Sequence, residues 1–284
     1  MMSDTLVDVH WLRRHFAAPG VVVVDCRFVL GDPQAGRRAY LAGHVPGAVY
    51  ANLEQDLSGP TGPLTGRHPL PDPAALAQCF AAWGIGPATR VVACDDAGGA
   101  MAARLWWLAR WLGHAHTAVL DGGYAAWLAA GLPVDTRVPA ARQGGFVARP
   151  ADALWVATDE VTAALAAGTG VLLDARAPAR FDGEEEPIDP VAGHVPGALN
   201  RPFSANLDGQ QRFLPPAVLR AAFETLLAGR APRTVMHMCG SGVTACHNLL
   251  AMEVAGLAGS RLYAGSWSEW IRDPARPVVA RQGD

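Results

Sequence analysis

The sequence predicts an α/β protein built from two tandem domains, each a parallel sheet with helices on both faces. Short apolar runs alternate with helical patterns along the chain, and this alternation is typical of parallel sheets joined by crossover helices. The strand-like runs are short and mostly apolar, as expected for strands that are buried on both faces. Three sequence blocks also recur in the same order in the two halves, which indicates duplication of one domain.

The repeated blocks and the periodicity place the elements. The paired blocks are 23–27 with 172–176, 42–48 with 192–198 and, more loosely, 120–127 with 263–270. The predicted strands are 21–25, 91–94, 118–120, 171–174, 234–238 and 261–263, and the predicted helices are 73–83, 99–112, 158–167, 216–228 and 243–255. The segment 133–152 is rich in proline and glycine, so it is the predicted linker. The N-terminal domain is then 5–132 and the C-terminal domain 153–280.

Composition limits the function. A chain of 284 residues that is 50% hydrophobic and 17% charged can form two substantial cores. The net charge of −3 gives no electrostatic case for nucleic-acid binding. No apolar run approaches the roughly 18 residues of a membrane span, and the polar start lacks a signal-peptide pattern. Five dispersed cysteines without zinc-site spacing predict free thiols, no metal, no cofactor and a cytoplasmic location.

The most informative stretch is 235–250, in which an apolar strand pattern ends at Cys239. A Gly-Ser-Gly turn follows, and then a helical pattern. The glycines allow the backbone to curl, and a curled loop that enters a helix turns several amide N–H groups inward as a nest for an anion. The same field favours the thiolate, which is the reactive form of cysteine. Cys239 is therefore the predicted nucleophile; an inert core cysteine is the alternative.

These motifs resemble those of the tandem-domain rhodanese superfamily of sulfurtransferases. The resemblance covers about residues 5–275 and is carried by the Asp-x-Arg strand ends, both Ala-Gly-His-Val-Pro-Gly-Ala blocks, Cys-Gly-Ser-Gly-Val-Thr-Ala at 239–245 and Gly-Ser-Trp-Ser-Glu-Trp at 265–270. It implies two rhodanese-like domains, of which only the C-terminal one is catalytic. The cysteine takes sulfane sulfur from a small anionic donor as a persulfide. The acceptor is then a thiol, cyanide or a thioredoxin-like protein.

The first copy carries Asp95-Asp96-Ala97-Gly98-Gly99 where the second copy has the cysteine loop. A carboxylate cannot carry sulfane sulfur, so the N-terminal domain is expected to be an inactive scaffold that lines part of an interdomain cleft. The long loop 52–72 of this domain could reach over the site of the other.

The resemblance also implies a donor. Members that use 3-mercaptopyruvate have Gly-Ser-Gly after the cysteine, as here, whereas thiosulfate-preferring members have bulky basic residues. In the former group a serine, a histidine and a carboxylate are proposed to form a proton relay. The matching residues are Ser241, His68 and Glu54, with Asp56 as a rival for Glu54. For His68 the alternative is an exposed loop histidine.

Arg180 matches the family arginine that binds the anionic donor, and a guanidinium fork suits a carboxylate. Gly240, Gly242, Val243 and Thr244 form the surrounding loop. The amides of this loop are expected to contact the sulfur or the donor. The hydroxyl of Thr244 is expected to steady the loop or to cap the following helix.

A second arginine that many 3-mercaptopyruvate enzymes carry is missing here. Its place falls near Ile188, inside the acidic loop 182–191, whose carboxylates are expected to be solvated. Arg67 is a candidate to compensate. Because of this departure, thiosulfate:cyanide sulfur transfer remains an alternative. A non-enzymatic sulfur-relay or binding module is the second alternative.

A related phosphatase class is disfavoured, because its longer cysteine loop ends in an arginine where this chain has Ala245. No nucleic-acid or membrane partner is expected, and the tandem domains predict a monomer.

Several other residues have a structural interpretation. The repeated polar residues occur in both copies, including the one without a cysteine loop, so they are expected to fix the fold: Asp25, Arg27, His44, Asp174, Arg176 and His194. Four tryptophans follow apolar helical patterns and are predicted core residues: Trp106, Trp107, Trp111 and Trp127. Trp267 and Trp270 are expected at the rim of the site. Cys246 is expected to be an inert buried thiol rather than a partner for oxidised Cys239.

Overall fold

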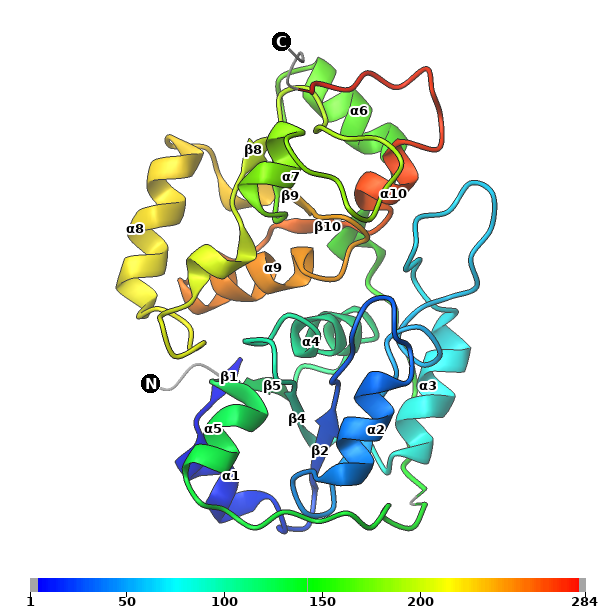
Figure 1. The fold of residues 1–284 in the computed structure, drawn as a ribbon, viewed down its shortest axis with the longest axis vertical. Coiled ribbons are helices and arrows are strands. Elements are labelled where there is room, and N and C mark those ends of the chain that lie inside the picture. Colours follow the sequence, from blue (N-terminus) through cyan, green and yellow to red (C-terminus); the bar gives the residue numbers. More distant parts are fainter. Residues whose placement is uncertain (1–4, 142, 281–284) are drawn as a thin grey trace. The chain divides into compact units, whose positions relative to one another are not determined.

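The computed structural model describes residues 5–141 and 143–280, which form two compact units (Figure 1). The N-terminal unit comprises Met1–Gly59, Leu70–Asp152 and Leu207–Phe213. The C-terminal unit comprises Pro60–Pro69, Ala153–Asn206 and Leu214–Asp284. Each unit therefore includes one short loop that comes from the other half of the chain.

The N-terminal unit is a five-stranded parallel sheet in the order β1-β5-β4-β2-β3. Its strands are β1 Leu6–Val7, β2 Val21–Asp25, β3 Val49–Tyr50, β4 Arg90–Cys94 and β5 Thr117–Leu120. Its helices are α1 Val9–His15, α2 Ala35–Ala42, α3 Pro73–Ala82, α4 Ala102–Trp111 and α5 Gly123–Ala129.

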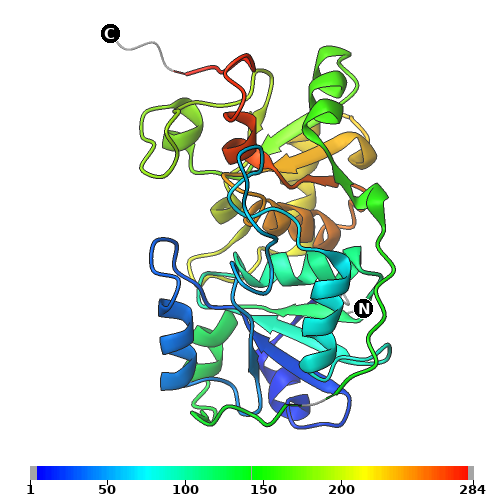
Figure 2. The same cartoon turned by 90° about the vertical axis from the view of Figure 1, so that its right-hand side faces the viewer.

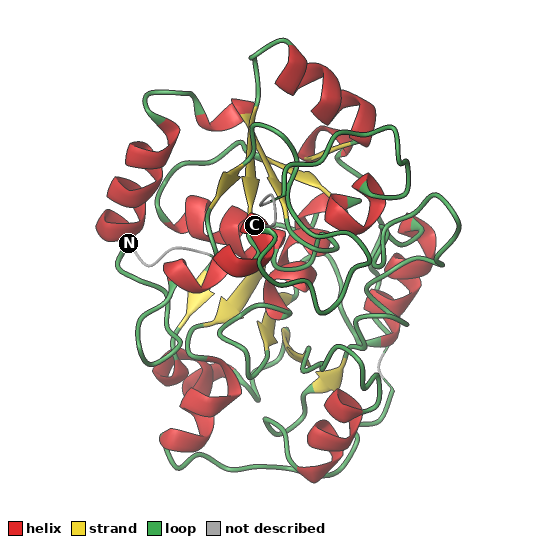
Figure 3. Cartoon of the chain, turned by 45° about the horizontal axis from the view of Figure 1, so that its top comes forward, coloured by secondary structure: helices red, strands yellow, loops and turns green. Residues whose placement is uncertain are grey.

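The C-terminal unit repeats this plan, in the order β6-β10-β9-β7-β8. Figure 3 shows strands in yellow and helices in red. Its strands are β6 Trp155–Val156, β7 Val171–Asp174, β8 Leu199–Asn200, β9 Val235–Met238 and β10 Arg261–Tyr263. Its helices are α6 Thr158–Ala166, α7 Pro178–Asp182, α8 Pro216–Leu227, α9 Ala245–Val254 and α10 Ser266–Trp270, with short 3₁₀ turns at Asp152–Leu154, Phe203–Asn206 and Pro232–Thr234.

This topology confirms the predicted fold class and fixes where a site can form. Crossovers between parallel strands are right-handed, so connections that run in opposite directions along a sheet place their helices on opposite faces. The direction changes between β7 and β9, which pair from Val171↔Val235 to Asp174↔Met238. Ligands of such sheets bind beyond the carboxyl ends of the strands at this switch point. Cys239 follows β9 there, and Arg180 follows β7 on α7.

The predictions from the sequence are correct for the long helices and the central strands, but they omit the two-residue edge strands and the short helices. All six predicted strands and all five predicted helices are present, with ends shifted by up to three residues. The edge strands β1, β3, β6 and β8 contain two residues each, too few to show a hydrophobic period. The short helices α1, α5, α7 and α10 and the polar helix α2 were also not predicted, since stable amphipathic patterns need more turns or more apolar residues.

The tryptophans are core residues in both units. The prediction is confirmed for Trp106, Trp107, Trp111 and Trp127, all of which are buried. The expectation that Trp267 and Trp270 lie at a rim is wrong, because both belong to the buried core of the C-terminal unit. Their indole N–H groups donate to the carbonyls of Val191 and Pro277, at 2.9 and 3.0 Å, so these large rings satisfy their polar atoms within the fold.

The repeated Asp-x-Arg motif forms the same buried ion pair in each unit. Arg27 bonds Asp25 at 2.6 Å and also donates to the carbonyl of Gly43 at 2.7 Å. The equivalent residues in the C-terminal unit are Arg176, Asp174 and Gly193, at 2.7 and 2.8 Å. Each arginine thereby ties the end of a central strand to the glycine that precedes the repeated histidine.

The repeated histidines make matching contacts as well. Nδ1 of His44 lies 2.7 Å from the carbonyl oxygen of Tyr40, and the two rings stack at 3.9 Å. Nδ1 of His194 lies 2.7 Å from the carbonyl oxygen of Phe181, with stacking at 3.8 Å. Because both units share these contacts, they support the structural interpretation of the repeated polar residues.

Candidate functional site

Cys239 is the first residue after β9 and is 2% exposed. Two backbone amides donate to its Sγ, from Ser241 at 3.5 Å and from Gly242 at 3.2 Å. Gly242 has φ +76°, and a Cβ there would lie 2.3 Å from the carbonyl oxygen of Ala264. Only glycine fits this position, so the loop curls around the sulfur as the sequence predicts. This arrangement stabilises negative charge on sulfur.

The segment 265–268 forms hydrogen bonds with the backbone of the cysteine loop. The amide of Cys239 donates to Oγ of Ser266 at 3.1 Å. In return, the amides of Trp267 and Ser268 donate to the carbonyls of Cys239 and Gly240, at 3.0 and 2.9 Å. Ser266 adopts φ +53°, a conformation that is costly for a residue other than glycine and that concentrates at functional sites. This positioning role of Ser266 was not predicted, because its only signal in the sequence is the Gly-Ser-Trp-Ser motif itself.

Pro60–Pro69 brings two further groups to the loop, and in Figure 2 it lies beside α10. The amide of Arg67 donates to Oγ of Ser268 at 2.9 Å. Nδ1 of His68 lies 2.8 Å from Oγ of Ser241. His68 is 3% exposed and Ser241 is 7% exposed. The interpretation of His68 as an exposed loop histidine is therefore wrong.

Glu54 and Asp56, the two candidates for the third relay member, belong to the N-terminal unit. Glu54 is exposed, and its amide donates to Oδ1 of Asn52 at 2.9 Å. Asp56 accepts from the amide of Asn52 at 2.7 Å, and burial raises the pKa of Asp56. The assignment of the relay carboxylate stays a prediction.

Two arginines flank the residue next to the nucleophile. A Cβ placed on Gly240 would lie 3.3 Å from Nη2 of Arg67, and 3.5 and 3.6 Å from Nη1 and Nη2 of Arg180. An added Cβ at position 240 would therefore contact both guanidinium groups and be tight only against Arg67, whereas a longer side chain would compete with both for space. The glycine after Cys239 leaves the space in which these two cations approach the loop.

The acidic loop pairs with these arginines. Arg180 donates from Nε and Nη2 to Glu186 and from Nη2 to Asp189. Arg67 donates from Nη1 to the other oxygen of Asp189 at 2.7 Å. The side chains of Glu186 and Asp189 are each 4% exposed. The expectation of solvated carboxylates is wrong for these two, although Asp182, Glu184 and Glu185 are exposed.

Opposing effects set the ionisation of Glu186. Burial acts to raise the pKa of this carboxyl, but hydrogen bonds from Arg180 and from the amides of Asp189 and Ile188 outweigh it. The pKa of Glu186 therefore lies below its ordinary value, and the carboxylate stays ionised at neutral pH. Arg180 is thus held in a fixed position by a permanent charge.

Val243 and Thr244 complete the loop. Val243 is buried. Thr244 precedes the first residue of α9 but makes no side-chain capping bond, so the capping expectation is wrong. It already has helical dihedrals, φ −70° and ψ −13°, whereas capping residues usually have extended ones.

The other thiols lack this environment. Burial, and then the charges of Cys94 and Asp25, raise the pKa of Cys26 well above its ordinary value. Burial and Asp25 do the same for Cys94, and burial raises the pKa of Cys79. Cys246 donates its thiol proton to the carbonyl of Gly242 at 3.4 Å. These contacts favour the neutral thiol, so Cys239 is the best nucleophile candidate.

The Rhodanese-like domain family matches this chain twice, at residues 8–130 and 157–273. The chain belongs to the rhodanese family. It is 50% identical over 281 residues to a probable 3-mercaptopyruvate sulfurtransferase of Pseudomonas aeruginosa, covering 98% of this chain and 99% of the relative. It is 41% identical over 264 residues to a putative thiosulfate sulfurtransferase of Mycobacterium tuberculosis, covering 92% of each.

The crystal structure of SseA from Escherichia coli, described among 3-mercaptopyruvate sulfotransferases, is also similar. It has a TM-score of 0.81 and 31% identity, and the match covers 93% of this chain and 99% of SseA. These relatives span both sulfur donors that the sequence left open.

In the first rhodanese domain, the loop that corresponds to the Cys239 loop surrounds a side-chain carboxylate with the same kind of backbone amides. Asp95 is the first residue after β4, as Cys239 is after β9. Its carboxylate accepts four backbone hydrogen bonds, at 2.8–2.9 Å, from Ala97, Gly99, Met101 and Ala102. A built-in anion therefore occupies the position at which the second domain presents its sulfur. This explains how the first copy keeps the loop without a cysteine.

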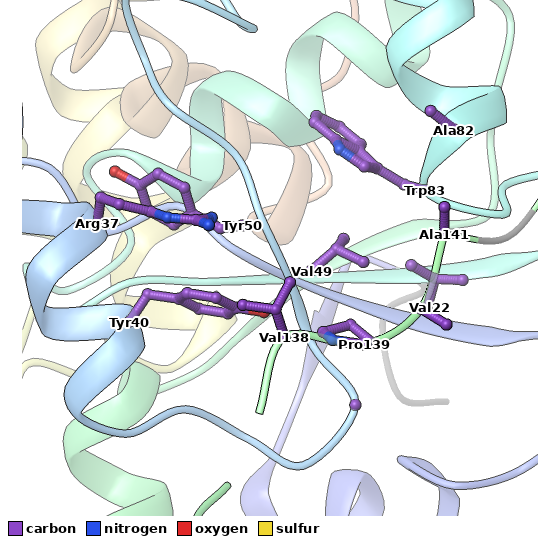
Figure 4. Close-up of a pocket in the computed structure, with 12 residues that line it drawn as sticks. Val22, Arg37, Tyr40, Val49, Tyr50, Ala82, Trp83, Val138, Pro139 and Ala141 are labelled. Atoms are coloured by element: carbon purple, nitrogen blue, oxygen red, sulfur yellow. The ribbon is translucent and has the colours of Figure 1, made fainter. Parts of the chain in front are cut away.

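The N-terminal unit also contains a pocket of about 200 Å³ (Figure 4). The guanidinium carbon of Arg37 lies 5.4 and 5.6 Å from the ring centres of Tyr40 and Tyr50. Trp83 and apolar residues complete the lining. The lining contains no cysteine, serine, histidine or carboxylate, so this pocket offers no group for sulfur transfer.

Within 5–141 and 143–280, no helix has the length and apolar character needed to cross a membrane. The same residues contain no group of three or more His, Cys, Asp or Glu side chains that could hold a metal ion.

Proposed function

We propose that this chain is a sulfurtransferase that moves sulfane sulfur from 3-mercaptopyruvate, through a persulfide on Cys239, to a thiophilic acceptor. The observation that carries the proposal is the amide nest around Sγ of Cys239, next to the His68–Ser241 hydrogen bond and two guanidinium groups. Nucleophile, proton donor and anion-binding groups thus meet at one loop.

The proposed reaction has two displacements. The Cys239 thiolate attacks the sulfur of 3-mercaptopyruvate and forms an S–S bond while the donor's C–S bond breaks. The carbon that leaves takes a proton and becomes pyruvate, and Ser241, hydrogen-bonded to His68, is placed to supply that proton. An acceptor thiolate or cyanide then attacks the outer sulfur, and the S–S bond breaks to restore the Cys239 thiolate.

Charge at the site supports 3-mercaptopyruvate over thiosulfate. Arg67 and Arg180 are balanced by Glu186 and Asp189, so the cluster is formally neutral. The loop itself adds no cation, because Gly240 and Ser241 follow the cysteine. A neutral, hydrogen-bonding cluster suits the single carboxylate of 3-mercaptopyruvate better than the two charges of thiosulfate, which need an excess of positive charge.

Steady-state kinetics with the two donors, each with cyanide as the acceptor, test this proposal. We expect kcat/KM to be at least about tenfold higher for 3-mercaptopyruvate, equivalent to about 1.4 kcal/mol of transition-state stabilisation. A higher value for thiosulfate would contradict the donor assignment. Absence of thiocyanate from both donors would instead support the relay-module alternative.

Replacement of Ser241 by alanine should reduce kcat with 3-mercaptopyruvate by about 10–100-fold, because the leaving carbon loses its proton donor. The same variant should change kcat with thiosulfate little, since sulfite leaves without a proton. His68→Gln should follow the same pattern, and His10→Gln, at an exposed position on α1, is the matched control. Equal losses with both donors would show that Ser241 and His68 only support the loop.

A further inference from the structure

The two arginines at the site present different edges to the donor. A guanidinium binds a carboxylate most strongly through a pair of parallel N–H donors, and the Nε–Nη2 edge supplies such a pair. In Arg180 this edge is occupied: Nε lies 3.1 Å and Nη2 lies 2.7 Å from Oε1 of Glu186. Only Nη1 of Arg180 lacks an acceptor among the described residues, so Arg180 can offer N–H groups from one nitrogen only.

Arg67 has the opposite arrangement. Its Nη1 pairs with Asp189 at 2.7 Å, which leaves the Nε–Nη2 edge available. Nε is buried and has no hydrogen-bond partner within the part of the chain that the structure describes. Nη2 lies 3.3 Å from the Cβ position of residue 240. A buried donor without a partner is costly, and an incoming carboxylate at this edge would satisfy it.

Asp189 sets the two arginines in one fixed arrangement. Its Oδ1 accepts from Arg67 and its Oδ2 accepts from Arg180. The backbone of Arg67 is fixed too, because its amide bonds Ser268. The side chain of Arg67 is 25% exposed as a whole although its Nε is buried, so a small carboxylate would approach from the Nη2 side to reach this edge.

We propose that Arg67 supplies the bidentate fork that binds the donor's carboxylate beside Cys239, and that Arg180 contributes one further donor. This inference rests on the proposed function. It gives Arg67 the anion-binding role of the second arginine that is missing near Ile188, more than a hundred positions later in the chain. It also assigns to Asp189 the role of positioning both arginines.

The proposed role of Arg67 can be tested with variants that keep the positive charge but lack the pair of parallel N–H donors. Arg67→Lys should raise KM for 3-mercaptopyruvate about tenfold or more, because lysine cannot make the paired contact, and it should leave kcat within about twofold. Arg180→Lys should raise KM less. Arg220→Lys, in an exposed ion pair with Glu224 on α8, is the matched control and should behave like the wild type. The affinity of the Cys239→Ser protein for pyruvate, measured by calorimetry, should fall in parallel when Arg67→Lys is added.

The outcomes separate this inference from the proposed function. If the wild type uses 3-mercaptopyruvate but Arg67→Lys changes neither KM nor pyruvate affinity, the fork assignment is wrong and the function stands. If kcat falls as much as kcat/KM, Arg67 acts by holding His68 in place, which also overturns the inference. If the wild type does not use 3-mercaptopyruvate, the proposed function fails, whereas pyruvate binding still reports on the fork.

Discussion

Replacement of Cys239 by serine is expected to abolish sulfur transfer from every donor. A serine oxygen at this position cannot form the S–S bond on which both displacements depend. The fold should persist, since Ser241 and Gly242 can direct their amides to an oxygen as well as to Sγ. Thiocyanate production and intact-protein mass spectrometry measure the effect: wild-type protein incubated with donor alone should gain the mass of one sulfur atom, and the variant should not.

Two other cysteines provide matched controls for this experiment. Cys79→Ser, in α3 of the N-terminal unit, and Cys246→Ser, in α9, should keep both turnover and the added sulfur. Cys246 lies in α9, the helix that follows the loop, and its thiol donates to the carbonyl oxygen of Gly242 at 3.4 Å. Substantial turnover by Cys239→Ser, or loss of the added sulfur in Cys246→Ser, would place the nucleophile elsewhere.

Asp174→Asn is expected to destabilise the protein strongly. Arg176 is 3% exposed and pairs with Asp174, which is fully buried. Removal of one charge of such a pair leaves the other uncompensated and costs about 3–5 kcal/mol. The midpoint of thermal unfolding should therefore fall by roughly 6–20 °C. Calorimetry or circular dichroism at neutral pH measures the shift.

The repeat supplies the comparison for this variant. Asp25→Asn breaks the same pair in the N-terminal unit, with Arg27 in place of Arg176, and a similar loss of stability is expected. Asp32→Asn removes an exposed pair with Arg38, which contributes at most about 1 kcal/mol. If Asp174→Asn and Asp32→Asn unfold at the same temperature, the structural role of the buried pair is refuted.

The sequence was most informative where local chemistry decides the structure. Mostly apolar runs located β2, β4, β7 and β9, because a strand that is buried on both faces has few polar positions. The loop at Cys239 was predictable for a similar reason, since Gly240 and Gly242 permit the tight curl that turns the amides toward the sulfur. His68 was found through its motif and not through any physical pattern, and its contact with Ser241 joins segments that are far apart in the sequence.

The charges around the site could not be read from the sequence. A run of acidic residues at 182–191 looks solvated because nothing local shows that Arg67 and Arg180 will meet it. Burial of Glu186 and Asp189 depends on those partners, so it is a property of the tertiary structure alone. The same reasoning applies to Ser266, whose strained backbone is supported by bonds to Cys239 and Tyr263.

The loop Pro60–Pro69 gives the duplication an evolutionary consequence. After a gene duplicates, the copy without a nucleophile is free to decay or to be deleted. Here that copy encodes His68 and Arg67, which the structure groups with the C-terminal unit. Natural selection for sulfur transfer therefore acts on both halves of the gene. Loss of the first half would remove these two residues while leaving Cys239 in place. The proposed roles of His68 and Arg67 would therefore give a reason to retain a domain whose own loop has no cysteine.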